Sequence, residues 1–240
     1  MSAGSVIVTG AGNGIGRAVV ERLLAQHTRV VAVDLDVSRL DTSTPEAMVV
    51  VEGDACDLGV IDQACIAAGG VSGVVACAGI SRPGPSDSYP RADWDQVLAV
   101  NVTAVFDLMV HAARTATTGA SFVAISSVTA NQGFAGRAGY AASKAAIDGM
   151  MRSLAIEYAP RIRVNSIVPG FIMTDIARRN IARGFISEES IVSRTPLGRW
   201  GEPADIAAAA QFLLSPDAAW ITGAAIPVDG GWAALGLGSL

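Results

Sequence analysis

The sequence predicts one doubly wound α/β domain, in which a parallel sheet of about seven strands carries helices on both faces. Three observations indicate this fold class. The chain has 240 residues, which is enough for one α/β domain with a sizeable core. Short apolar runs alternate with longer helical stretches from end to end, as in repeated βαβ units. A glycine-rich turn joins the first run to the first helical stretch. We therefore treat residues 1–240 as a single domain.

Strands are predicted where β-branched and apolar residues form short runs between turn residues. Several runs are almost entirely apolar, as expected for strands covered on both faces. In chain order, the predicted strands are Ser5–Thr9, Arg29–Asp34, Met48–Glu52, Gly73–Ala76, Phe122–Ser126, Arg163–Ile167 and Ala225–Val228. The predicted helices are Gly14–Ala25, Ile61–Ala67, Trp94–Thr117, Tyr140–Tyr158 and Ala204–Leu214. Residues 171–201 contain no clear strand, and we expect a substrate loop or lid there, beyond the carboxyl ends of the strands.

The composition indicates a protein whose surface is partly covered by other subunits. Hydrophobic residues make up 51% of the chain and charged residues only 16%, with a mean hydropathy of +0.43. We therefore expect a homo-oligomer, either a tetramer or a dimer. The longest apolar runs, such as Val71–Ile80, fall well short of the roughly 18 residues typical of a membrane span. No membrane crossing is expected, and the absence of a basic leader segment predicts a cytoplasmic protein.

Other classes of function find little support in the sequence. The net charge is −5 without a basic cluster, which argues against binding of nucleic acid. Cys56, Cys65 and Cys77 are odd in number and lack C-x-x-C spacing, so neither a disulfide framework nor a zinc site is expected. His27 and His111 are far apart, which leaves few ligands for a histidine metal site. We therefore predict no metal.

The first predicted strand leads into a glycine-rich loop that opens a helix. Gly10, Gly14 and Gly16 fit the pattern T-G-x-x-x-G-x-G, whereas Ile15 occupies the position that the last glycine of G-x-G-x-x-G would need. Such a turn allows backbone N–H groups to approach a pyrophosphate at the positive end of the helix dipole. Asn13 adds no charge to the loop. A dinucleotide site is therefore predicted, with a tight structural turn as the alternative.

The carboxylate of Asp34 favours NAD over NADP. Asp34 ends the second predicted strand, eighteen residues after Gly16, close to the spacing of a carboxylate that binds the adenosine ribose. It would accept hydrogen bonds from both ribose hydroxyls and repel a 2′-phosphate, and Asp36 adds negative potential nearby. Arg17 and Arg39 argue in the other direction, for NADP, because an arginine can bind a 2′-phosphate.

Tyr140 and Lys144 form a candidate general acid/base pair. Lys144 is the only lysine beside sixteen arginines, and it follows Tyr140 by four residues on a predicted helix. Positions i and i+4 share a helix face, so the ammonium group is expected to lower the pKa of the tyrosine toward neutral pH. A phenol of that kind can exchange a proton with an alcohol or carbonyl oxygen. The alternative is an exposed Tyr/Lys pair on an ordinary helix.

The glycine loop and the Tyr140/Lys144 pair on one α/β chain resemble the compact type of short-chain dehydrogenase/reductase, over the range from Val6 to Trp232. The resemblance implies a Rossmann fold and hydride transfer between an alcohol and a nicotinamide. It implies that Ser127, thirteen residues before Tyr140, orients the substrate oxygen, with the adjacent Ser126 as the alternative. It also implies that Asn101 supports a water-linked proton path. The catalytic residues implied are Asn101, Ser127, Tyr140 and Lys144.

The resemblance adds further cofactor contacts. Asp54 and Ala55 correspond to residues beside adenine, and the segment around Pro169–Gly170 corresponds to one that flanks nicotinamide. The usual N-N-A-G after the fourth strand is replaced by Ala76-Cys77-Ala78-Gly79, which removes side chains that tie this strand end to its neighbour. Together, the expected cofactor-binding residues are Gly10, Asn13, Gly14, Ile15, Gly16, Asp34, Asp54, Ala55, Ala78, Gly79, Tyr140, Lys144, Pro169, Gly170, Ile172 and Thr174.

The expected function is NAD-dependent interconversion of a hydrophobic secondary alcohol and its ketone. The substrate pocket is expected within residues 171–194, together with Val128, Gln132 and Phe134, and its apolar wall is expected to contain Phe171, Ile176, Ile181 and Phe185. Cys77 is either a redox-sensitive thiol or a packing residue. The apolar tail Trp232–Leu240 is expected to pack on a neighbouring subunit, with a frayed end as the alternative.

Two other functions remain as alternatives at this point. An NAD-binding sensor or scaffold protein can use the same fold. Sugar-nucleotide epimerases and dehydratases of the extended branch also pair a tyrosine with a lysine, but those chains are usually longer.

Overall fold

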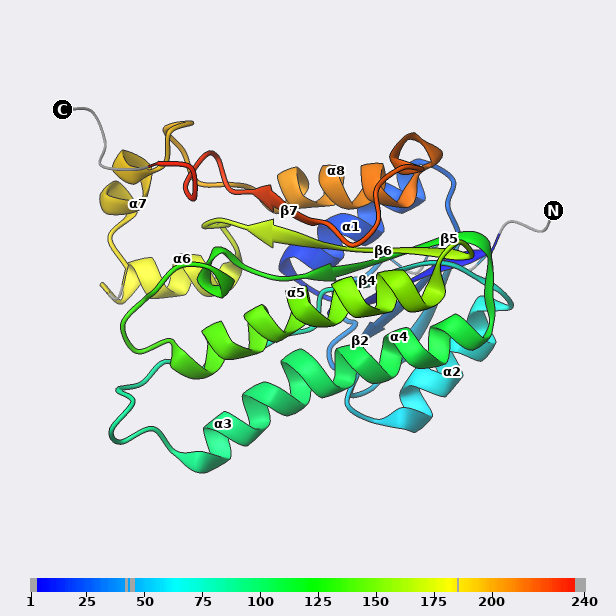
Figure 1. Ribbon diagram of the computed structural model, residues 1–240, viewed down its shortest axis with the longest axis horizontal. Helices are drawn as coiled ribbons and strands as arrows, with labels where there is room; N and C mark the ends of the chain where they lie inside the picture. The colour runs from blue at the N-terminus through cyan, green and yellow to red at the C-terminus, as the bar shows by residue number, and fades with distance from the viewer. Residues whose placement is uncertain (1–3, 42, 44–45, 185, 236–240) are drawn as a thin grey trace.

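Seven parallel strands form the central layer of the computed structural model, which describes residues 4–41, 43, 46–184 and 186–235 (Figure 1). Their order across the sheet is β3-β2-β1-β4-β5-β6-β7, and every neighbouring pair is parallel. The strands are β1 Ser5–Thr9, β2 Val30–Asp34, β3 Met48–Glu52, β4 Val71–Ala76, β5 Ala116–Ile125, β6 Ile162–Pro169 and β7 Ala225–Val228. The predicted fold class is confirmed.

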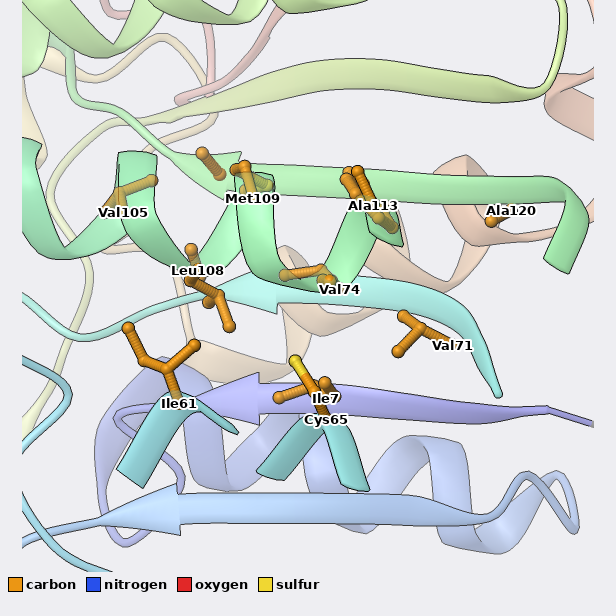
Figure 2. Packing of buried hydrophobic residues seen from close by; sticks show 14 of the residues in the cluster. Ile7, Ile61, Cys65, Val71, Val74, Val105, Leu108, Met109, Ala113 and Ala120 are labelled. Atoms are coloured by element: carbon orange, nitrogen blue, oxygen red, sulfur yellow. The ribbon is translucent and has the colours of Figure 1, made fainter. Parts of the chain in front are cut away.

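Helices cover both faces of this sheet (Figure 1). On one face lie α1 (Gly14–Ala25) and α8 (Pro203–Leu214), whose apolar residues pack against alternate positions of the central strands. The opposite face is covered by α2 (Leu58–Ala68), α4 (Ala104–Arg114) and α5 (Ala138–Tyr158). Figure 2 shows side chains of α2 and α4 meeting those of β1 and β4. Two buried layers therefore sandwich the sheet.

The strand order positions the site. From β1 the chain proceeds outward through β2 to β3, and it then returns to place β4 on the other side of β1. Connections that leave β1 and β4 in opposite directions open a crevice at the carboxyl ends of these strands. The glycine loop follows β1 directly, and Gly79 lies just beyond β4.

The long helix predicted over Trp94–Thr117 is wrong at its end. It is composed of α3 (Arg91–Leu98), a π-helical turn (Ala99–Thr103) and α4, which ends at Arg114. The next residues already belong to β5, because Ala116 pairs with Val71 of β4. The β-branched threonines that follow the helix favour this extended conformation.

Residues 171–201 contain no strand, as predicted, but they contain two short helices. These are α6 (Asp175–Ala182) and α7 (Glu188–Arg194). The side chains of Thr174 and Ser187 cap them by accepting hydrogen bonds from backbone N–H groups in their first turns. Capping residues of this kind are the local signal that marks where such short helices begin.

Residues 91–114 form the single helical stretch, among the described residues, with the length and apolar composition of a membrane span. In this structure the stretch lies against the protein core. Its Val97, Leu108 and Met109 are fully buried, and Figure 2 shows Leu108 and Met109 directed at the sheet.

Candidate active site

Two cavities lie at the carboxyl ends of the strands. The first, of about 520 Å³, is lined by the glycine loop and by the ends of β2, β3 and β4. The second, of about 450 Å³, is lined by Ser127 and Tyr140 together with mainly apolar residues. Lys144 joins them: its Nζ lies 5.6 Å from the centre of the Tyr140 ring, and a Cβ on Gly79 of the first cavity would lie 3.5 Å from that Nζ.

Most of the predicted cofactor residues line the first cavity. Those that do are Gly10, Asn13, Gly14, Ile15, Gly16, Asp34, Asp54, Ala55, Ala78, Gly79 and Thr174. Gly170 and Tyr140 line the second cavity instead. Ile172 lines a separate pocket with Gly201, and Pro169 lines none of these cavities. The structure therefore gathers the phosphate and adenosine residues but separates Ile172 from them.

Backbone contacts fix the glycine loop. Gly10 has a φ of +66°, and a Cβ there would lie 2.7 Å from the backbone nitrogen of Ala78. A Cβ on Gly16 would collide with the carbonyl oxygen of Gly10. Gly12, which sequence reasoning did not single out, is equally confined by the carbonyl oxygen of Asp36. The sequence does show it, as the second of the four glycines between Gly10 and Gly16. The loop thus admits no side chain at three positions.

Asp34 points its carboxylate at this loop. One oxygen accepts the N–H of Gly12 at 2.8 Å, and the other accepts the N–H of Asp36 at 3.0 Å. The carboxylate is therefore held at the end of β2, on the wall of the first cavity.

The two arginines that could bind a 2′-phosphate are paired with acids. Arg39 donates to Asp175 at the start of α6 over 2.6 Å, and Arg17 donates to Glu21 over 2.7 Å. Asn13 of the loop also donates to Asp175 over 3.4 Å. The first residue of α6 thus contacts both the glycine loop and the segment after β2.

Tyr140 and Lys144 lie on α5 and are not an exposed pair. Lys144 is 5% exposed, and its Nζ donates to the carbonyl of Ile125 over 2.7 Å. Burial lowers the pKa of Lys144 to about 8. Lys144 can therefore exchange a proton near neutral pH.

The prediction that Lys144 lowers the pKa of Tyr140 is wrong for the protein on its own. Burial raises the pKa of Tyr140, while a hydrogen bond from Ser127 and the charge of Arg137 oppose that shift. The reason is desolvation, which disfavours phenolate and also weakens the charge of the buried lysine. Sequence reasoning missed Arg137, although it precedes Tyr140 by only three residues.

The structure distinguishes the two adjacent serines. Ser127 lines the second cavity, and its Oγ accepts the N–H of Thr129 at 3.2 Å. The hydroxyl of Ser126 points the other way and donates to the carbonyl of Lys144 over 3.2 Å. Ser127 is therefore the serine placed to contact a ligand.

Asn101 is fully buried within the π-helical turn. Its amide group pairs with the backbone of Ile80, accepting at 2.8 Å and donating at 2.9 Å, and it also donates to Ser143 at 3.0 Å. It thereby ties the segment after β4 to α5. This support compensates for the side chains absent from Ala76-Cys77-Ala78-Gly79.

Cys77 behaves as a packing residue. It packs against the core beneath α1 and α8, and burial raises the pKa of its thiol to about 12. A thiol that stays protonated at neutral pH is a poor nucleophile, which disfavours the redox interpretation.

Aromatic side chains from distant parts of the chain form the wall of the second cavity. The ring centres of Phe171 and Trp232 lie 4.5 Å apart, and those of Phe171 and Phe134 lie 6.1 Å apart. Trp232 is 3% exposed, and its indole N–H donates to Gln132 over 2.9 Å. The expectation that this tail packs on another subunit is therefore wrong at Trp232, which is buried in its own chain. Residues 236–240 lie outside the described residues.

Other predicted wall residues are distributed differently. Ile176 lines the first cavity, and Ile181 packs beside the aromatic cluster. Phe185 lies outside the described residues. The second cavity is instead completed by residues that sequence reasoning had not named individually, including Ile186, Ile191, Arg137 and Arg194.

Comparison with known proteins identifies the family. A family model described as enoyl-(acyl carrier protein) reductase matches residues 10–233. The (3R)-3-hydroxyacyl-CoA dehydrogenase of Canis lupus familiaris is 35% identical over 94% of each chain. Galactitol 2-dehydrogenase (L-tagatose-forming) of Cereibacter sphaeroides is 36% identical over 94% of this chain and 93% of the relative.

Solved structures agree. A short-chain dehydrogenase/reductase from Brucella melitensis, described as glucose/ribitol dehydrogenase, has a TM-score of 0.91 at 32% identity over 96% of each chain. ElxO, solved with NADP bound, has a TM-score of 0.88 at 26% identity and covers 97% of this chain and 100% of its own. The glycine loop, the Tyr140/Lys144 pair and these matches lead to one conclusion: the chain belongs to the short-chain dehydrogenase/reductase family of oxidoreductases.

Proposed function

We propose that this protein is an NAD-dependent oxidoreductase that interconverts a hydrophobic secondary alcohol and its ketone by hydride transfer. The observation that carries the proposal is the position of α5. Tyr140 faces the apolar cavity beside Ser127, while Lys144, one turn later, lies near Gly79 of the dinucleotide cavity. A group that exchanges a proton with the substrate oxygen and an acceptor of hydride from the adjoining carbon would therefore meet at one alcohol group.

The residues of the chain divide the chemistry as follows. Bound NAD would supply the hydride acceptor. Tyr140 takes the proton of the alcohol in oxidation and returns it in reduction, and the Ser127 hydroxyl donates to the substrate oxygen as charge develops there. In oxidation, neutral Lys144, with its pKa of about 8, first accepts the phenol proton of Tyr140, which leaves a phenolate to take the alcohol proton. The ammonium group formed in this way then supplies positive charge beside Tyr140. Asn101 holds the segment after β4 and supports the proposed water path.

Most of the residues proposed to hold NAD line the two cavities, whereas Lys144, Pro169 and Ile172 lie outside both linings. The glycine loop would bind the pyrophosphate, Asp34 the ribose hydroxyls, and Asp54 and Ala55 the adenine. Around the nicotinamide end the proposed contacts are Tyr140, Lys144, Pro169, Gly170, Ile172 and Thr174.

Two contacts favour NAD over NADP. The carboxylate of Asp34 would bind the ribose hydroxyls and repel a 2′-phosphate, and Arg39 is already paired with Asp175. ElxO, a solved structure of the same fold, has NADP bound. We expect the preference for NAD or NADP to depend on the charged side chains at the end of β2 and just after it.

The apolar cavity supports a hydrophobic substrate. Its walls include Phe134, Phe171, Ile186, Ile191 and Trp232, and a volume of about 450 Å³ is within the range of small-molecule sites. A polyol would leave many hydroxyl groups unpaired against these apolar walls.

The test is NADH formation with a panel of cyclic and aromatic secondary alcohols, with NAD and NADP compared by kcat/KM. We expect turnover with NAD and a clear preference for NAD over NADP. A preference for NADP would overturn the role of Asp34. Tight NAD binding without turnover of any alcohol or ketone would instead support an NAD-binding sensor or scaffold.

We also propose that the protein works as a homo-oligomer, a tetramer or a dimer, in the cytoplasm. The support is exposed apolar surface away from the site: Trp220 is fully exposed, and Ile156 is 79% exposed. Such side chains are typical of surfaces that are covered by a partner. We expect Trp220→Asp to lower the mass measured by light scattering. An unchanged mass would remove this surface from the interface.

A further inference from the structure

Two arginines line the apolar cavity that contains Tyr140. Arg137 and Arg194 are the charged residues of the described wall, which contains no aspartate or glutamate. This is unexpected for a chain with a net charge of −5. Neither arginine forms a salt bridge within the described residues, whereas Arg17, Arg39 and Arg199 do.

Arg194 is fixed from one side only. It ends α7, and its guanidinium carbon lies 4.2 Å from the centre of the Trp232 ring. Trp232 is itself held by Gln132 and Phe171. Stacking on an aromatic face orients a guanidinium group while leaving its N–H donors free at the edges. Arg194 therefore presents a preformed set of donors to the cavity.

Arg137 is fixed near the reacting hydroxyl. It lies on the wall with Tyr140, and one of its terminal nitrogens donates to the Ser81 hydroxyl over 2.7 Å. Its charge acts on the pKa of Tyr140, which agrees with this close placement. The second terminal nitrogen of the group has no hydrogen-bond partner among the described residues.

We propose that Arg137 and Arg194 form an anion subsite that binds the carboxylate of the substrate, so that the substrate class is an apolar hydroxy acid and the corresponding oxo acid. A planar carboxylate matches the paired donors of a guanidinium group. Arg194 is exposed and Arg137 is partly exposed, so the orientation of their donors, rather than exclusion of water, would favour the contact. This inference rests on the proposed function for the reaction, but the subsite itself can be tested without turnover.

The first experiment measures binding to the complex with NADH through tryptophan fluorescence. The probes are 3-phenylpropanoate and its amide, which differ in charge and have nearly the same shape. We expect the carboxylate to bind about tenfold more tightly, equivalent to about 1.4 kcal/mol. Equal affinities would overturn the subsite, and tighter binding of the matching phosphonate would overturn its assignment to carboxylates.

Variants then locate the effect. Arg194→Gln should reduce the ratio of the two affinities to about one while leaving amide binding measurable, which shows that the cavity is intact. Arg152→Gln removes the same charge from an exposed position of α5 and should keep the preference. A preference for carboxylate that survives Arg194→Gln together with Arg137→Gln would overturn the proposal.

Turnover separates this inference from the proposed function. The substrates are 3-hydroxy-3-phenylpropanoate and its methyl ester. A higher kcat/KM for the acid supports the subsite, and equal values for both overturn it while the proposed reaction stands. Tighter binding of the carboxylate without oxidation of either compound would support the subsite and count against the proposed reaction.

Discussion

The two sides of the site are built in different ways. On the cofactor side, Gly10, Gly12 and Gly16 are confined by backbone atoms of their own or neighbouring segments. On the substrate side, Phe134, Phe171, Trp200 and Trp232 contact one another through their rings. A surface made of closely approaching backbone accepts no added side chain, whereas a wall of side chains can change shape without moving the backbone. We therefore expect the cofactor side to tolerate fewer substitutions than the substrate side.

The largest expected effect comes from adding one methyl group to the cofactor side. In Gly16→Ala the new Cβ would collide with the carbonyl oxygen of Gly10, so we expect NADH binding to be lost and the free energy of unfolding to fall by about 3 kcal/mol or more. Denaturant unfolding and calorimetric titration with NADH measure both quantities.

Gly149→Ala is the matched control. The nearest atom to a Cβ there is 3.9 Å away, and the helix should gain up to about 1 kcal/mol. Normal NADH binding by Gly16→Ala would contradict the view that backbone contacts define the cofactor side.

The next effect concerns Lys144, which lies between the two sides. Its pKa is lowered from 10.5 to about 8, so between these values the unfolded chain holds a proton that the folded chain has released. The free energy of unfolding should therefore rise with pH in this window, by up to about 3 kcal/mol. Above pH 10 the raised pKa of Tyr140 acts in the opposite direction.

The measurement compares wild type and Lys144→Met by denaturant unfolding between pH 7 and 10. The difference between the two proteins isolates Lys144 from the other groups that titrate. If the free energy of unfolding changed with pH in the same way in both proteins, Lys144 would be better solvated than its burial indicates.

A smaller and more selective effect is expected on the substrate side. Phe171→Ala removes a ring that packs on Phe134, Trp200 and Trp232. We expect a loss of about 2 kcal/mol in the free energy of unfolding and a higher KM for the substrate, with the Kd for NADH unchanged. Ile66→Ala, exposed on α2, serves as the control and should change neither. Equal weakening of NADH and substrate binding would show that the two sides are not independent.

The cofactor side and the substrate side also differ in how well they could be predicted from the sequence. The glycine loop, Asp34 and the Tyr140/Lys144 pair are local patterns whose spacing reflects a turn, a strand end or one helix face. In the structure the loop and Asp34 line one cavity, and Tyr140 and Lys144 lie on one helix. The positions of the strands along the sequence were predictable because buried parallel strands are almost entirely apolar.

The substrate wall could not be predicted in the same way. Trp232 and Gln132 are 100 residues apart, and no local pattern indicates that they touch. Helices α6 and α7 have eight and seven residues, too short for periodicity to identify them. The pKa of Tyr140 depends on burial by segments far from it in sequence, which the spacing of Tyr140 and Lys144 does not encode.

The smallest expected effect concerns the ion pair that joins the segment after β2, on the cofactor side, to α6. Asp175 at the start of α6 pairs with Arg39 over 2.6 Å, and both side chains are partly exposed. In Asp175→Asn, the released Arg39 could bind a 2′-phosphate, and we expect kcat/KM for NADP to rise about threefold. Asp41→Asn, which removes a carboxylate from an exposed position after β2, is the control. An unchanged NAD/NADP ratio would show that Arg39 does not reach the cofactor.

The most direct test of the proposed chemistry compares wild type with Tyr140→Phe, measuring kcat on an alcohol that the wild type oxidises and the Kd for NADH. Removal of a general acid/base should lower kcat by at least about a hundredfold. The Kd for NADH should rise far less, because only one hydroxyl at the nicotinamide end is lost and the glycine loop and Asp34 are untouched. Turnover retained near the wild-type rate would contradict the role of Tyr140 as the group that exchanges the proton.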